Sequence, residues 1–194
     1  GSASDNPILA AGGVWDNALK DYCLGKRNQP AWAIGEAEYT SGNGIDSVQN
    51  IFFLPAFNAE SVYEALHKGK FYVRSYSENN INISLSDFHI EDSLNKDNPG
   101  PKAFMGDKIQ ITGRPRLFIK GNFTNSPAGN LKAKVIRDGK VIREFEFINE
   151  QVFNLEFQDD WPPASGKKSY FRLIFVADNR VILATNPVFV IKNE

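Results

Sequence analysis

The chain has 194 residues, of which 42% are hydrophobic and 23% charged, with 22 basic and 23 acidic side chains. This composition is typical of a globular protein with one large domain, or one domain and a smaller unit. The balanced charge argues against dedicated nucleic-acid binding, which usually requires a basic excess, and no apolar run of about 18 residues predicts a membrane span. The single cysteine, Cys23, excludes an intrachain disulfide. Gly1-Ser2 resembles a cloning scar, so we expect the natural N-terminus to lie upstream, which leaves the compartment open.

The first 75 or so residues are predicted to combine two short helices with strands. Apolar side chains recur at helical spacing over residues 15–23, and Gly25 follows where a C-terminal cap belongs. Asn58 is a suitable N-terminal cap for a second helix, which Gly69 ends. The inner face of that helix is predicted to hold Val62, Tyr63 and Leu66. The remaining predicted elements are a buried strand over 31–34, a loop over 40–50 and a strand over 71–75.

From about residue 80 the period of the apolar residues changes from 3.6 to 2, which indicates strands. The alternation inverts between Leu85 and Phe88, and a bulge at residues 86–87 would produce that inversion. Two-residue hairpin turns are predicted at Asp138-Gly139 and Asp178-Asn179. The predicted strands lie at 81–90, 109–111, 117–119, 131–135, 141–148, 153–157, 171–175 and 187–192.

This series of about eight or nine short strands predicts a mainly β fold. The specific expectation is an Ig-like antiparallel β-sandwich preceded by a short, truncated α/β segment. We place the α/β segment at residues 1–77 and the sandwich at 78–194. The helices must bury their apolar faces, most simply on the sandwich. Because the strands carry most of the Phe and Ile residues, we expect a chain that begins near residue 78 to remain folded.

Asp87, His89 and Glu91 share one face of a predicted strand and are spaced by two residues. Such spacing can present ligands to a metal ion. We favour the alternative, a solvent-facing polar stripe opposite Phe88 and Ile90, which should point into the core. Two carboxylates beside one imidazole favour its protonated form, and a protonated histidine is a poor metal ligand.

Three other residues could in principle take part in catalysis or binding, but each has a simpler structural interpretation. His67 lies on the polar side of the second predicted helix, where we expect it to be solvated. Cys23 falls on an apolar helix face, which favours burial as a small hydrophobic residue. Trp161, in the acidic loop over 159–163, is a candidate ligand platform of a sugar-binding sandwich, although a tryptophan there more often packs against the core.

Four stretches of the sequence occur in the order and spacing found in a known enzyme family. They are Trp15-Asp16-Asn17-Ala18-Leu19, Ala33-Ile34-Gly35, Glu60 to Leu66 leading into Gly69-Lys70-Phe71-Tyr72-Val73, and Asn186-Pro187-Val188-Phe189-Val190. The first three resemble the C-terminal end of the PHP (polymerase and histidinol phosphatase) superfamily of metal-dependent phosphoesterases. The last is similar to the ending of the CehA/McbA-like branch, which carries an appended β-sandwich. The resemblance touches both ends and about half of the chain, and it implies a divalent metal as the cofactor of the family.

The sequence departs from the family pattern at its metal ligands. In the family, Gly-x-x-Asp-x-His supplies late ligands, and here Glu38 stands in the place of the Asp and Thr40 in the place of the His. The resemblance therefore implies Glu38 as a possible metal ligand, whereas threonine is a poor ligand for transition metals. The earlier ligands of the family, including its His-x-His, belong to an N-terminal part that this sequence does not contain.

These observations predict a non-catalytic accessory or structural region of a PHP-like metallohydrolase, with no cofactor of its own. The expected partner is the absent N-terminal catalytic region or another protein, without nucleic acid or a membrane span. One alternative is a carbohydrate- or protein-binding module that uses loop aromatics. A second is a metal-dependent phosphoesterase completed by another chain.

Overall fold

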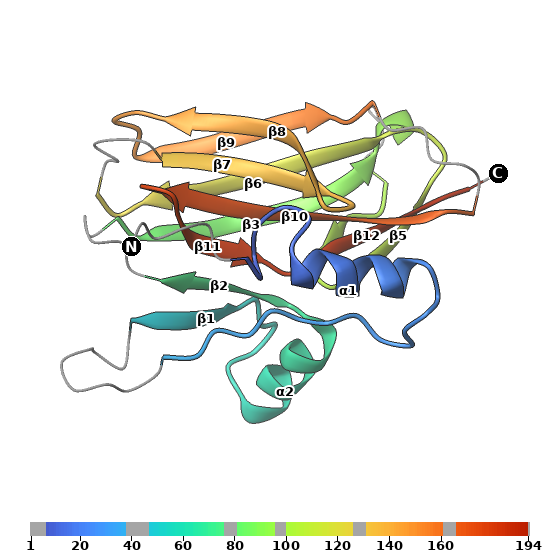
Figure 1. Cartoon of the computed structure of the whole chain (residues 1–194), viewed down its shortest axis with the longest axis horizontal. Helices are drawn as coiled ribbons and strands as arrows, with labels where there is room; N and C mark the ends of the chain where they lie inside the picture. The colour runs from blue at the N-terminus through green and yellow to red at the C-terminus, as the bar shows by residue number, and fades with distance from the viewer. Residues whose placement is uncertain are drawn as a thin grey trace.

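The computed structural model describes residues 7–37, 47–75, 81–95, 100–125, 131–160 and 166–193. Two β-sheets face each other, and two short helices accompany the larger sheet (Figure 1). The mainly β fold predicted from the alternating strands is therefore confirmed, as is the short α/β segment before it. Within the described residues, neither helix is long and apolar enough to cross a membrane.

The larger sheet has eight strands. Six of them are hydrogen-bonded in the order β1-β2-β11-β10-β12-β5. The other two branch from β10, because β7 pairs with β10 and β8 pairs with β7. Described pairs are antiparallel except β5 with β12. The strands are β1 (Val48–Phe52), β2 (Phe71–Ser75), β5 (Lys108–Ile111), β7 (Leu131–Arg137), β8 (Lys140–Phe147), β10 (Lys168–Ala177), β11 (Arg180–Thr185) and β12 (Val188–Lys192).

The smaller sheet has four strands in the order β4-β3-β6-β9. They are β3 (Ile83–Asp92), β4 (Ala103–Phe104), β6 (Pro115–Phe123) and β9 (Val152–Gln158), and a 3₁₀ turn, Ser93–Asn95, follows β3. The main core lies between the two sheets. Four phenylalanine rings from both sheets meet there with centroids 5.0 to 5.8 Å apart for most pairs; they are Phe123, Phe147, Phe153 and Phe175.

Turn chemistry and the bulge agree with the sequence-based predictions. Asp138 and Gly139 both have positive φ angles, 49° and 76°, and they connect β7 to β8. The second pair, Asp178-Asn179, adopts φ angles of 48° and 64° between β10 and β11. The register of β3 against β6 shifts between Leu85 and Asp87, which confirms the predicted bulge.

Both predicted helices are present, as α1 (Val14–Cys23) and α2 (Ala59–Lys68). Gly25 follows α1 with a φ of 74°, and Asn58 caps α2 by accepting a hydrogen bond from the Ser61 amide at 2.8 Å. The predicted inner face of α2 is partly wrong, because Tyr63 is 64% exposed and Ala65 is the buried residue of that helix.

Two predictions for the first segment are wrong. Residues 31–34 do not form a strand; their chain is extended, and Ile34 is 64% exposed. Side chains take the place of a neighbouring strand there, since the Ala33 amide donates to Asn186 and the Gly35 amide to Asn50, each on its Oδ1 atom. Part of the predicted loop, from Val48 onward, is instead strand β1, because it pairs along its whole length with β2.

The helix-bearing segment is joined to the sandwich in two ways. Strand β2 pairs with β11, so β1 and β2 extend the larger sheet. Helix α1 covers the outer face of that sheet in a second apolar cluster, which confirms that a helix buries its face on the sandwich (Figure 1). The members of this cluster from α1 and the sheet include Trp15, Leu19, Tyr22, Ile136, Tyr170, Ile174 and Phe189. A division of the chain at residue 77 stays a prediction.

Candidate functional site

The strand face that carries Asp87, His89 and Glu91 is not exposed, which overturns the expectation of a solvent-facing stripe. His89 is 2% exposed and Glu91 is 6% exposed. The cause lies in neighbouring strands, because the register places Phe104 of β4 and Phe118 of β6 directly beside His89. The Phe118 ring stacks on the imidazole at 4.7 Å between centroids, and the Phe104 ring lies 5.4 Å away. The predicted inward positions of Phe88 and Ile90 are confirmed.

Both nitrogens of the His89 ring face carboxylate oxygens. The distance from Nδ1 to Asp87 Oδ1 is 2.7 Å, and that from Nε2 to Glu91 Oε1 is 3.1 Å. A ring that donates from both nitrogens is an imidazolium, so this geometry fits the charged form. Lys102 adds a second cation, with its Nζ 3.2 Å from Glu91 Oε1. His89, Lys102 and the two carboxylates of Asp87 and Glu91 thus form one hydrogen-bonded cluster on the outer face of the smaller sheet, which we call the His89 cluster.

Both ring nitrogens of His89 are already engaged by carboxylate oxygens. A metal ion at His89 would have to displace a carboxylate from a ring nitrogen, which would leave buried polar atoms without partners. Among the residues that the structure describes, no group of three or more histidine, cysteine or acidic side chains is arranged to hold a metal. Glu38 and Thr40, at the positions of the family ligands, lie outside the described residues, as does Trp161.

The pKa of Glu91 predicts how the His89 cluster responds to acid. Burial raises this pKa, but the hydrogen bonds and charges of Lys102 and His89 outweigh burial and hold it below the ordinary value of 4.5. A carboxyl with a lowered folded-state pKa stabilises the fold above its unfolded pKa and loses that contribution as the pH falls through the folded value. We therefore expect the stability difference between the native chain and Glu91→Gln to shrink below about pH 4.5. Urea unfolding at pH 7, 5 and 3.5 measures this difference, and a gap that stays constant over this range would contradict the assignment.

A second buried charged group joins α1 to β10. The Asp16 carboxylate accepts hydrogen bonds from Arg172 Nε at 2.7 Å and Nη2 at 2.8 Å, and both side chains are fully buried. The Tyr170 hydroxyl donates to the same carboxylate at 2.8 Å, and the Gly12 amide donates at 2.7 Å. The Trp15 ring lies 4.8 Å from the guanidinium carbon. We call these residues, Gly12, Trp15, Asp16, Tyr170 and Arg172, the Asp16–Arg172 interlock.

The electrostatics of the Asp16–Arg172 interlock are those of a structural contact. Burial, reinforced by the Asp16 charge, raises the pKa of the Tyr170 hydroxyl far above its ordinary value, so the hydroxyl remains a donor. Arg172 Nη2 also donates to the Leu9 and Ala10 carbonyl oxygens, at 3.0 and 3.2 Å. In the described part of the chain, Arg172 Nη1 is the one buried side-chain nitrogen or oxygen without a hydrogen-bond partner. The carboxylate is thus enclosed by donors and has no open side for a substrate.

Sequence reasoning did not identify the interlock, although a signal for it was present. Arg172 interrupts an apolar run, Tyr170 to Val176, that is otherwise typical of a fully buried strand. Arginine is almost never fully buried without a partner, so its place in that run predicts a buried carboxylate. The partner could not be named from the sequence, since Asp16 lies 156 residues away.

His67 and Cys23 are placed as expected. His67 is exposed on α2, with its ring 4.3 Å from that of Tyr63. Cys23 is half-buried against the apolar cluster beneath α1. Burial, together with the nearby Asp138 charge, raises the pKa of its thiol to about 12. The reactive thiolate is therefore scarce at neutral pH, which suits a packing role.

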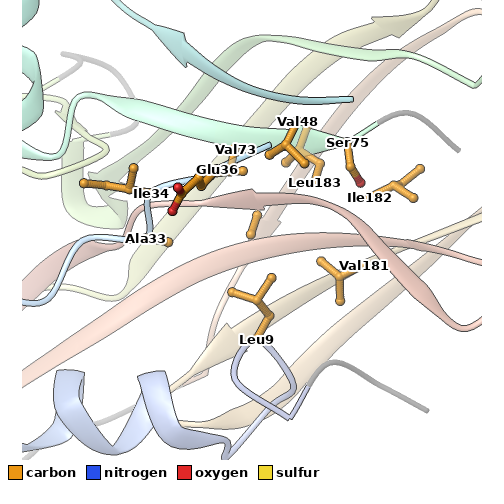
Figure 2. Close-up of a pocket in the computed structure, with 12 residues that line it drawn as sticks. Leu9, Ala33, Ile34, Glu36, Val48, Val73, Ser75, Val181, Ile182 and Leu183 are labelled. Carbon is orange, nitrogen blue, oxygen red and sulfur yellow. The ribbon is translucent and has the colours of Figure 1, made fainter. Parts of the chain in front are cut away.

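Two pockets are relevant to the function of the chain. The first, about 240 Å³, lies between β2, β11 and the extended chain at 33–36, with Leu9 on its other side (Figure 2). Its walls are mostly aliphatic, and Glu36 and Ser75 supply the polar side chains. The second, about 610 Å³, is an apolar groove between the turn after β1 and strand β4. It adjoins the His89 cluster, because Phe104 lines the groove and its ring contacts the His89 ring.

The sequence of the chain was compared with protein-family models and with curated proteins. No protein-family model matches the chain, and no curated protein matches it.

Proposed function

We propose that the chain is a non-catalytic accessory region of a PHP-like metallohydrolase, in which a β-sandwich holds the short α/β segment in a fixed position. The observation that carries this proposal is the Asp16–Arg172 interlock. Asp16 belongs to the stretch that resembles the family near the start of the chain, and its carboxylate attaches α1 to Tyr170 and Arg172 of β10. A carboxylate that is buried and hydrogen-bonded in this way supports a structural role for Asp16 rather than a catalytic one.

The other stretches that carry the resemblance also meet in space. The Asn186 side chain accepts a hydrogen bond from the Ala33 amide at 2.8 Å and donates one to the Phe71 carbonyl oxygen at 3.1 Å. Asn186 is 1% exposed, so these bonds are shielded from water. One asparagine thereby ties together three segments that are far apart in the sequence. This arrangement supports the proposal that the family-like residues have a joining role in this chain.

A metal-dependent phosphoesterase assay tests the proposal. We expect no turnover of a generic phosphate ester with added zinc or manganese, because a metal that is not firmly ligated neither holds nor acidifies a water molecule. The matched control is Glu38→Ala, which removes the one acidic side chain at a family ligand position. Metal-dependent turnover by the native chain that this variant loses would contradict the proposal and favour an enzyme completed by another chain.

A binding module is the second candidate, and exposed aromatic side chains favour it. Phe53 and Phe104 line the apolar groove and are 37% and 42% exposed, and Phe57, two residues after the groove residue Pro55, is 99% exposed. Large apolar side chains gathered around a groove mark binding surfaces more often than ordinary solvent-facing positions. Phenylalanine lacks the polar groups with which sugar-binding sites make hydrogen bonds, so within this candidate a protein ligand is favoured over a carbohydrate.

A further inference from the structure

The apolar groove is built by elements that are distant in the sequence. Six side chains contribute its apolar lining; they are Phe53, Leu54, Pro55, Phe88, Phe104 and Met105. Its volume of about 610 Å³ lies within the range of ordinary ligand pockets. The His89 ring packs against Phe104 and so supports one wall from behind. The groove is therefore part of the folded structure, held in shape by a buried cluster.

The charge of the groove restricts what can occupy it. Lys70 is the one charged side chain among the described residues of the lining, and it forms an ion pair with Asp107. Asp107 in turn accepts a hydrogen bond from the Phe104 amide at 3.0 Å, which fixes its carboxylate beside the groove. The Lys70 charge is thus paired, although the two side chains remain 24% and 37% exposed. The groove favours an apolar and uncharged occupant, because a charged group would lose hydration without gaining an unpaired partner.

The chain itself presents such a group close in sequence to the groove. Phe57 follows Pro55 by two residues and immediately precedes Asn58, the N-terminal cap of α2. A hydrophobic residue at that position commonly packs onto the fourth helical residue, here Val62, as a hydrophobic staple. Phe57 does not, since it is 99% exposed. An exposed aromatic ring therefore lies only two residues along the chain from the lining of an apolar groove.

We propose that this surface binds a second copy of the chain, with Phe57 of each copy inserted into the groove of the other. An isologous contact requires one patch that is complementary to itself, and an exposed ring and a groove in the same chain meet that requirement. The contact removes two fully exposed phenylalanine rings from water, one from each copy. It also fills two apolar grooves with the uncharged group that their lining favours. This inference does not depend on the accessory role proposed above.

Sedimentation equilibrium over about 5–500 µM, combined with NMR of the methionine methyl group, tests this contact. The chain has one methionine, so methyl-labelled protein gives one signal, from Met105 in the groove. We expect a monomer–dimer equilibrium and a Met105 signal that shifts with the same concentration dependence. Central aromatic anchors commonly lose tenfold to thirtyfold or more in affinity on truncation. Phe57→Ser should therefore abolish dimers in this range and remove the concentration dependence of the signal.

Two further variants make the result specific. Ile148→Ser removes another exposed apolar side chain, 68% exposed in the turn between β8 and β9, and should leave the association unchanged. Leu54→Glu blocks the groove with a charge but keeps Phe57, so it should be monomeric alone. Mixed with Phe57→Ser, it should form a heterodimer through the one intact contact. Circular dichroism confirms that each variant is folded.

Three outcomes would overturn the inference. The first is a native chain that stays monomeric throughout. The second is a dimer that survives Phe57→Ser or is lost in Ile148→Ser. The third is a Met105 signal that is independent of protein concentration but moves when a small apolar molecule co-purified with the chain is extracted, because the groove would then be a ligand pocket.

Discussion

Asp16→Ala is expected to lower the free energy of unfolding by about 3–5 kcal/mol, since removing one partner of a buried ion pair leaves the other charge uncompensated. The Arg172 side chain is 0% exposed and loses two hydrogen bonds to the carboxylate in this variant. The Leu9 and Ala10 carbonyl oxygens still accept hydrogen bonds from Nη2, but Nη1 has no partner among the described residues, and Nε loses the carboxylate. The free energy of unfolding of a domain is typically only about 5–15 kcal/mol, so the expected loss is a large part of it.

Thermal and urea unfolding measure this effect. For a chain of this length we expect the melting temperature to fall by roughly 6–20 °C. Asp21→Ala is the matched control, because Asp21 lies on the same helix but pairs with Lys26 at the surface, and its loss should change stability by less than about 0.5 kcal/mol. The double variant Asp16→Ala, Arg172→Met should recover much of the loss, since it removes the unpaired charge and leaves an apolar side chain. An Asp16→Ala chain that unfolds within about 1 kcal/mol of the native one would contradict the proposed role.

Deletion of residues 1–77 is expected to prevent stable folding, which reverses the sequence-based expectation that the sandwich remains folded alone. The deletion removes α1 and uncovers four large apolar side chains on the outer face of the larger sheet; they are Ile136, Ile174, Val176 and Phe189. At about 1.5–3 kcal/mol each, their burial contributes roughly 6–12 kcal/mol as an upper estimate. Phe71 and Tyr72, both buried, are also lost together with the partner strand of β11.

Amide dispersion in a ¹H–¹⁵N NMR spectrum and cooperative thermal unfolding test the deletion. A chain that begins at Pro7 serves as the control, because it retains every described residue and should unfold as the full chain does. We expect the chain that begins at residue 78 to aggregate or to give a collapsed amide spectrum. A dispersed spectrum with a cooperative transition would instead establish residues 78–194 as an independent domain.

The local features of the fold could be predicted from the sequence because they depend on neighbouring residues. The turn at Asp138-Gly139 requires positive φ angles that these residue types tolerate. The cap of α2 depends on Asn58 and on an amide three residues later. The bulge after Leu85 was visible as an inversion of the apolar alternation, because side chains alternate strictly between the two faces of a strand.

The tertiary structure decided the features that depend on which elements become neighbours. The alternation placed His89 opposite the core, but only the register of β4 and β6 brings Phe104 and Phe118 over its ring and buries it. Strand β1 is short and polar at its centre, so its sequence is typical of a loop. It forms a strand because it pairs with β2. The sequence by itself therefore determined most strands of the sandwich, its two hairpin turns and the inward faces of those strands, whose physical causes lie within a few residues, whereas the strands β4 and β11 were not predicted. The burial of the charged clusters was decided by packing between distant segments, because desolvation of a side chain depends on every element that covers it.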